Sequence, residues 1–219
     1  MMEMLQKYGP DILLGFGTTM YSWLAGTIGG LILGALIELA RRFGPRALSW
    51  PIVAYVEFFR GTPFLVQLFV LYYGGPLIGL RLDALPAGIL GLSLYGAAYF
   101  TEIMRAGFDA VPAGQIEAAR AMGFRTSTIV YRIMIPVMMV SALPALVNFA
   151  IILTKETVIL SMITVPEIMF QTQTIMSETF VFVLPILILA LFFWAFVEVI
   201  SRLGRLLERR FTHYLLDRS

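Results

Sequence analysis

Cysteine is absent from this chain, and histidine occurs only once. The missing cysteines exclude disulfide bonds and thiol chemistry. The single histidine, His213, lies in the basic C-terminal stretch, which excludes a serine–histidine pair or a histidine metal site in the apolar part of one chain. The ATP-binding pattern G-x-x-x-x-G-K-[ST] is missing too. We therefore expect no catalytic residue, no metal and no cofactor in this chain.

Charge is scarce as well. Charged residues make up 14% of the 219 residues, against about 25% in a typical soluble domain. Hydrophobic residues make up 59% and the mean hydropathy is +0.84. The apolar runs are continuous rather than alternating, and several reach the roughly 20 residues that a bilayer-spanning helix needs. We predict an all-α integral membrane protein, with residues 1–219 forming a single transmembrane domain in the lipid bilayer.

Five apolar runs are long enough to predict membrane helices: residues 13–39, 51–73, 85–104, 133–153 and 180–200. In the first run, Gly26 and Gly30 form a GxxxG spacing, which is typical of closely packed membrane helices. The fourth run could bend near Pro144. Residues 154–179 are of mixed polarity, and either a re-entrant piece or a half-helix lining a cavity would fit them.

The distribution of lysine and arginine predicts the orientation. With the N-terminus outside, the cytoplasmic side receives residues 41–46, residues 105–132 and the C-terminal tail, which hold most of the basic residues. The outer side keeps Lys7, Arg81 and Lys155. We predict a multi-pass protein of the cytoplasmic membrane, with its C-terminus in the cytoplasm. The net charge of only +2 argues against nucleic acid as a partner.

A short helix former interrupts the apolar runs at residues 115–122, which read QIEAARAM. Pro112 marks its entry, and Gly123 is a natural C-terminal stop. Three apolar side chains spaced three apart share one face of this helix: Ile116, Ala119 and Met122. Periodicity alone allows a helix that lies on the lipid surface. The small side chains of Ala118 and Ala119 fit better into a groove of another protein.

The segment Glu117-Ala118-Ala119, with Gly123, Ile133 and Ile135-Pro136 after it, resembles the EAA loop of permease subunits of binding-protein-dependent ABC importers. In that family pattern, only a leucine is replaced here, by Ile135. The resemblance implies a cytosolic coupling helix, within a loop of about residues 109–136, that docks into a groove on the ATPase subunit. The coupling residues carried over from the family are Glu117, Ala118, Ala119, Arg120, Met122 and Gly123.

A second segment, Glu57 to Pro63 with Gln67, resembles the E-x-x-R-G-T-P-x-x-x-Q run of polar amino-acid permeases. The likeness extends to Lys155 and weakens at residues 157–159. It implies a type I importer fold of about five transmembrane helices in a bacterial inner membrane. It also implies four kinds of partner: a second permease subunit, identical or paralogous, two ATPase subunits that bind ATP and Mg, an extracytoplasmic solute-binding protein, and lipid.

Polar residues inside or beside the apolar runs are candidates for the solute path, since a zwitterionic solute needs both donors and acceptors. The candidates are Glu57, Arg60, Thr62, Gln67, Asn148, Lys155, Glu156 and Thr157. Asn148 and Lys155 share a face if their helix continues that far. Hydrogen bonding between helices is the alternative role for such residues. Glu57–Arg60 and Glu102–Arg105 are spaced i,i+3 and could instead be pairs that neutralise each other.

We therefore expect a non-catalytic, membrane-spanning subunit of an ATP-driven importer, which passes polar amino acids from a binding protein across the membrane by alternating access. One alternative is a membrane scaffold or assembly subunit of another ATP-driven complex. Another is the same type of permease for a different small solute, such as an opine. Polar residues within the membrane helices favour transport over a scaffold.

Overall fold

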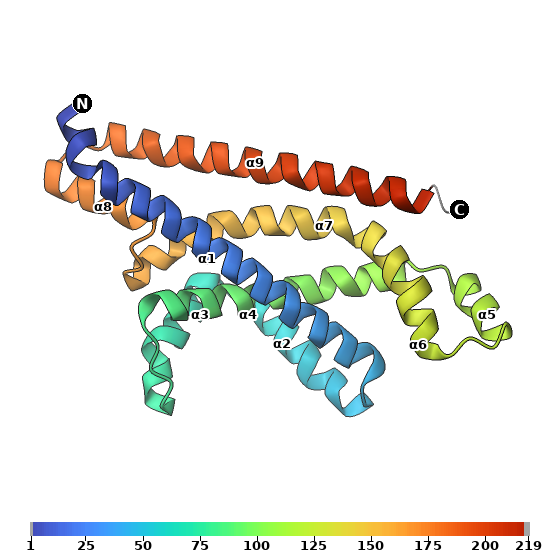
Figure 1. The fold of residues 1–219 in the computed structure, drawn as a ribbon. Coiled ribbons are helices and arrows are strands. Elements are labelled where there is room, and N and C mark those ends of the chain that lie inside the picture. Colours follow the sequence, from blue (N-terminus) through green and yellow to red (C-terminus); the bar gives the residue numbers. More distant parts are fainter. Residues whose placement is uncertain (1, 217–219) are drawn as a thin grey trace.

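The computed structural model describes residues 2–216, and these residues form helices and no strand. Four long helices dominate the view in Figure 1: α1 (Met2–Phe43), α4 (Ala84–Asp109), α7 (Ile135–Glu156) and α9 (Val183–Leu216). The shorter helices are α2 (Ser49–Gly61), α3 (Phe64–Phe69), α5 (Ala113–Ala121), α6 (Thr126–Ile129) and α8 (Ile168–Thr179). The N-terminus and α8 lie at one end of the molecule, and the C-terminus, α5 and α6 lie at the other (Figure 1).

Within residues 2–216, four helical stretches are long and apolar enough to cross a membrane: Gln6–Phe43, Ala84–Asp109, Thr126–Ile163 and Val183–Arg209. A fifth candidate is the pair Arg46–Gly61 and Phe64–Ile78, in which the chain bends by 111° between the two helices. The expectation of about five spans is confirmed, with the bent pair counted as one.

The prediction that residues 51–73 form a single helix is wrong. The chain leaves helical geometry at Thr62, where φ is −121° and ψ is 148°, and α3 begins after Pro63. Proline has no N–H to donate, and its ring pushes the preceding residue towards extended backbone. Pro63 therefore separates two helices that point in different directions.

Glycines bring α1 and α4 into close contact. A Cβ at Gly34 would lie 2.8 Å from the Cβ of Phe100, and one at Gly30 would lie 3.2 Å from the carbonyl carbon of Gly96. Such approaches are closer than a side chain allows, so the two backbones meet directly. A Cβ at Gly26 would likewise lie 2.7 Å from the Cβ of Leu92, so the packing role predicted for Gly26 and Gly30 is confirmed.

Aromatic and aliphatic side chains attach α7 to α4. Phe149 stacks on Tyr99 with ring centroids 4.5 Å apart and meets Phe100 edge-on at 5.1 Å. Phe100 and Leu153 are buried beside it. Helix α7 continues through Pro144 as far as Glu156, so the proline does not end it.

The mixed segment of residues 154–179 forms the 3-10 turn Thr157–Ile163 followed by α8. Helix α8 packs on α1, where a Cβ at Gly15 would lie 3.1 Å from the Cα of Ile168. Thr164 and Phe180, on either side of α8, have φ of 64° and 55°. The segment is thus a 3-10 turn and a short helix, and α8 is too short to be a membrane span.

Candidate coupling helix and solute path

Helix α5 is a short helix with a well-formed end. Pro112 precedes it, and Gly123 follows it with φ of +79°, a conformation that favours glycine. The Gly123 N–H donates to the Arg120 carbonyl at 2.9 Å, and the Phe124 N–H donates to the Ala119 carbonyl at 3.1 Å. These two bonds form a Schellman motif. The sequence prediction of a helix stopped by Gly123 is confirmed.

Two side chains hold α5 on the body of the protein: Ala119, which is fully buried, and Ile116, which packs on the main core. The sequence predicted that Met122 would share this face, but its side chain is 67% exposed. Met122 still donates its N–H to the Ala118 carbonyl at 3.1 Å, but a spacing of six residues places it about 120° around the helix from Ile116.

The opposite side of α5 is open. Its exposed residues combine two charges with small and large apolar side chains: Glu117, Ala118, Arg120, Ala121, Met122 and Phe124. An exposed surface of this mixed kind, on a helix held by few contacts, suits docking by another protein. It lies at the same end of the molecule as the C-terminus (Figure 1).

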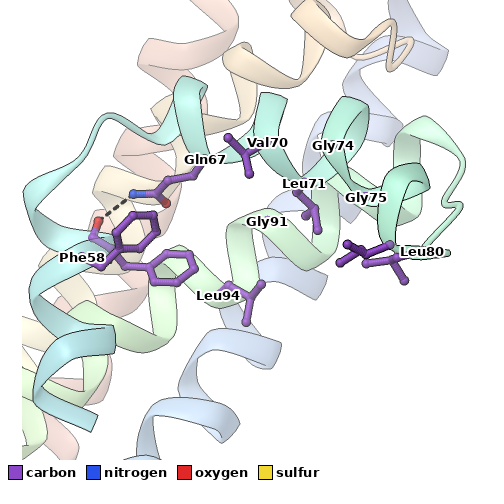
Figure 2. A pocket seen from close by; sticks show the side chains of 11 residues that line it. Phe58, Gln67, Val70, Leu71, Gly74, Gly75, Leu80, Gly91 and Leu94 are labelled. Carbon is purple, nitrogen blue, oxygen red and sulfur yellow. Dashed lines mark hydrogen bonds between the residues drawn. The ribbon is translucent and has the colours of Figure 1, made fainter. Parts of the chain in front are cut away.

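Gln67 lies at the bend of the second span, is 9% exposed and forms its hydrogen bonds within this span. Its Nε2 donates to the carbonyls of Phe59 and Thr62, both at 2.9 Å, and to Thr62 Oγ1 at 2.8 Å. Thr62 Oγ1 in turn donates to the Phe58 carbonyl at 2.8 Å. Figure 2 shows the amide turned back towards α2. These bonds occupy carbonyls that the interrupted helix leaves without an N–H partner.

Beside the bend lies a cavity of about 350 Å³ between α2, α3, the segment of residues 70–80 that follows α3, and α4 (Figure 2). Its lining is almost entirely apolar: Phe58, Phe59, Gln67, Val70, Leu71, Gly74, Gly75, Ile78, Leu80, Gly91 and Leu94. A zwitterion would lose its hydration here, and the only polar side chain in the lining is Gln67, whose Oε1 has no hydrogen-bond partner among the described residues. This cavity is therefore unsuited to a polar amino acid.

Arg60 and Glu57 do not pair with each other, although they are spaced i,i+3. Arg60 instead reaches Glu102 of α4, at 3.6 Å, and its guanidinium lies 5.5 Å from the ring centre of Tyr99. Among the side chains that the structure describes, none forms an ion pair with Glu57, which is exposed. The second predicted pair, Glu102–Arg105, is present at 3.0 Å.

The ion pairs around Glu102 continue into a network that the sequence did not predict. Arg41 contacts Glu38 at 2.6 Å and Glu102 at 3.2 Å. Arg42 contacts Glu38 at 3.0 Å and Asp109 at 2.5 Å. The side chain of Glu38 is only 1% exposed. The spacing of Glu38 with Arg41 and Arg42, three and four residues on, was the available signal.

Two further cavities, of about 410 and 240 Å³, border this network. Both are lined by Arg60, Glu102 and Arg105, and the larger also by Ser141 and neighbouring alanines. Guanidinium groups beside a polar cavity can bind a carboxylate, and Glu102 can accept bonds from an ammonium. No group of three or more metal-binding side chains occurs in the described part of the chain.

Four candidates lie on or after α7. Asn148 and Lys155 are exposed and, because α7 continues to Glu156, they share one face as predicted. Glu156 is half-buried. Thr157 is fully buried, and its Oγ1 donates to the Thr154 carbonyl at 2.7 Å. Of the eight path candidates, Gln67 and Thr157 are therefore enclosed by their own segments.

A buried carboxyl group that the sequence did not single out lies at the start of α8. Glu167 is fully buried and accepts a bond from the Phe170 N–H at 2.8 Å, while Thr19 Oγ1 of α1 lies 3.5 Å from its other oxygen. Burial raises the pKa of Glu167 to about 7. Its position directly before the apolar start of α8 was the only sequence signal.

Comparisons with known proteins agree with this geometry. The chain is 34% identical over 206 residues to the probable amino-acid ABC transporter permease protein YckA of Bacillus subtilis (strain 168), which covers 94% of this chain and 91% of that protein. It is 34% identical over 202 residues to the arginine transport system permease protein ArtQ of the same organism, with 92% of each chain covered.

The same likeness appears among solved structures. The crystal structure of an amino acid ABC transporter with histidines matches with a TM-score of 0.87 and 33% identity, over 94% of this chain and 96% of that chain. The inward-facing MetNI methionine ABC transporter matches with a TM-score of 0.72 and 20% identity over 95% and 98% of the two chains, which supports the fold alone. A family model matches residues 26–213. The chain belongs to the family described as binding-protein-dependent transport system inner membrane component.

Proposed function

We propose that this chain is the membrane-spanning subunit of an ATP-driven importer for polar amino acids. The observation that carries the proposal is α5, which is anchored by Ala119 and leaves Glu117, Ala118 and Met122 exposed. Relatives named as amino-acid permeases support the choice of solute. The chain is non-catalytic, and ATP and Mg are bound by a separate ATPase subunit.

Helix α5 docks on one of two ATPase subunits. Ala118 and Ala121 let the partner approach closely, while Glu117 and Arg120 give the contact its orientation. Gly123 ends the helix so that the chain can turn back into the membrane. Because α5 is tied to α4 and α7, movement of the ATPase can reach both spans.

A second permease subunit faces the open side of α7. Asn148 and Lys155 are exposed on a helix that crosses the membrane, and such groups are costly in contact with lipid. A second copy, identical or paralogous, encloses this face and completes a path for the solute. An extracytoplasmic binding protein delivers the solute to the end of the molecule where α8 lies.

The path candidates divide into residues that offer a charge or an amide to the solute and residues that shape the walls of the path. Arg60 and Lys155 provide positive charge for the solute carboxylate, and Glu57 and Glu156 provide negative charge for the ammonium. Asn148 supplies an amide on the same face as Lys155. Three other candidates shape the walls of the path through bonds within their own segments: Thr62, Gln67 and Thr157.

The orientation places α5 in the cytoplasm and the N-terminus outside. Because the chain has no cysteine, single cysteines can be labelled without background. Leu77, 89% exposed, and Ala47, also exposed, lie at the two ends of the bent span. An impermeant thiol reagent applied to intact cells should label Leu77→Cys and not Ala47→Cys. The reverse result would overturn the orientation.

Purification of the tagged protein in mild detergent tests the whole proposal. Mass spectrometry should identify an ATPase with a Walker motif, and proteoliposomes of the complex should take up amino acids when ATP is present. Ala118→Arg on α5 should lose the ATPase, whereas the matched change Ala47→Arg at the same end should keep it. A wild-type preparation without any ATPase would favour a scaffold, and a preference for opines in the uptake panel would change the solute.

A further inference from the structure

The ion network at the α5 end of the molecule joins three helices in one continuous chain of contacts. Asp109, the last residue of α4, contacts Arg42 of α1 at 2.5 Å and Arg105 at 3.2 Å. Arg42 contacts Glu38, Glu38 contacts Arg41, and Arg41 contacts Glu102, each within 3.2 Å. Glu102 finally holds Arg60 of α2.

The two ends of this network lie at the two places that must move together. Asp109 is followed by only three residues before α5 begins at Ala113. Arg60 is followed by Gly61, where α2 ends and the chain turns into the bend. Arg42 also lies over the ring of Phe108, 4.9 Å from its centre, which fixes the guanidinium beside Asp109.

The contacts are not equally tight. Those that join α1 to α4 measure 2.5 and 3.2 Å, whereas the contact of Arg60 with Glu102 measures 3.6 Å. Glu102 keeps Arg41 and Arg105 when Arg60 leaves. Helices α1 and α4 thus form one unit, to which α2 is attached by a contact that can be broken without leaving a carboxylate unpaired.

Stability alone is a weak reason for such a network. Glycine-mediated packing already holds α1 against α4, and a buried carboxylate such as Glu38 costs desolvation that its partners only partly offset. A set of ion pairs with one weaker member suits an element with two arrangements, and coupling between sites requires such an element.

We propose that Arg42 and Asp109 are positioning residues for energy coupling, which tie the start of the α5 loop, through Glu38, Arg41 and Glu102, to Arg60 at the bend of the second span. A displacement of α5 by the ATPase reaches Asp109 first and is passed through Arg42 to α1 and Glu102. The contact of Arg60 with Glu102 then breaks, and the end of α2 moves. This inference rests on the proposed function.

Reconstituted complexes in proteoliposomes, with the ATPase and the binding protein, test the relay through the number of solute molecules imported per ATP hydrolysed. Asp109→Asn and Arg42→Gln should each lower this ratio about 5-fold or more, the range of ordinary coupling between sites. They should also raise ATP hydrolysis in the absence of solute. Asp109→Asn removes the contacts with both Arg42 and Arg105, so its effect should be at least as large as that of Arg42→Gln, and the double variant should be no worse than Asp109→Asn alone. Asp109→Glu should restore the ratio.

Glu198→Gln is the matched control, because Glu198 of α9 forms an exposed ion pair with Arg202 at 2.7 Å, and neither residue contacts the network. It should leave the ratio unchanged. If Asp109→Asn fails to assemble, Arg42→Lys serves instead, since lysine keeps the charge but lacks the fork that reaches two carboxylates.

Four outcomes are decisive. A wild-type ratio in Asp109→Asn or Arg42→Lys would overturn the relay, and so would a parallel loss of uptake, ATP hydrolysis and assembled complex, which marks a purely structural role. Absence of ATP-driven uptake in the wild type would instead overturn the proposed function. A lower ratio with normal assembly, rescued by Asp109→Glu, establishes the relay.

Discussion

The contact between α1 and α4 and the open face of α7 are built from opposite kinds of residue. On α1, Gly30 and Gly34 remove side chains so that two backbones touch. On α7, Asn148 and Lys155 project polar groups that find no enclosure within the chain. The first surface is complete within this chain, whereas the second is the face that we propose a second subunit covers. The part of the chain that holds its own shape is thus distinct from the part that we propose for the solute path.

Gly34→Leu should give the largest effect, because it breaks the closed side of this comparison. A Cβ at Gly34 already lies 3.0 Å from the Ala97 carbonyl oxygen, so a leucine forces the helices apart. We expect a loss of about 3 kcal/mol of stability, at the upper end of overpacking. Thermal unfolding in detergent, followed by tryptophan fluorescence, measures it.

Gly17→Leu is the control for this change. Nothing lies within 4 Å of a Cβ at Gly17, which is in the same helix and exposed. The unfolding midpoint of Gly17→Leu should stay at the wild-type value. Equal losses at Gly17 and Gly34 would contradict the close-contact explanation, because leucine has a higher helix propensity than glycine and propensity alone would not lower stability.

Gln67→Leu should come second, with a loss of about 2 kcal/mol. The change removes three hydrogen bonds and leaves the carbonyls of Phe59 and Thr62 without that donor in a buried site. Thr62→Val removes one of these bonds and should cost less. Unfolding curves of the two variants measure these losses. A larger loss of stability in Thr62→Val than in Gln67→Leu would contradict the account of the bend.

The sequence predicted the features that depend on local pattern. The apolar runs, the stop at Gly123 and the GxxxG contact all follow from spacing along one segment, and each is present. The angle at Pro63 could not be predicted, because a proline breaks a helix without setting the direction of the next one. The partner of Arg60 was missed for a related reason, since Glu102 is reached only when α2 and α4 are placed in space.

The site shows the same division. The exposed side of α5 could be inferred from its residues, apart from Met122, which we expected on the same face as Ile116 and Ala119. Glu38 and Glu167 were missed because burial of a carboxylate depends on the elements that cover it. Local spacing therefore identified the segments of function, while the ion network required the tertiary structure.

Asn148→Ala and Lys155→Ala test the open side, and they should leave stability unchanged. Each removes a polar group from the face that we propose lines the path, so uptake should fall about tenfold, which corresponds to about 1.4 kcal/mol. Ile152→Ala, an exposed apolar change on the same helix, is the control. Normal uptake by both variants would place the path elsewhere.

The smallest effect is expected at Glu167, which should contribute to the slope of the free energy of unfolding with pH. Because burial raises its pKa from 4.5 to about 7, the folded protein holds a proton that the unfolded chain releases between these values. The stabilisation is complete below pH 4.5 and is lost as pH rises to about 7, by at most about 1.4 kcal/mol per pH unit. In Glu167→Gln this component of the slope should vanish, while in Glu178→Gln, an exposed carboxyl on the same helix, it should persist. Unfolding midpoints measured between pH 4 and pH 8 (about one unit apart) compare the three proteins, and an unchanged slope in Glu167→Gln would show that the carboxyl ionises normally against α1.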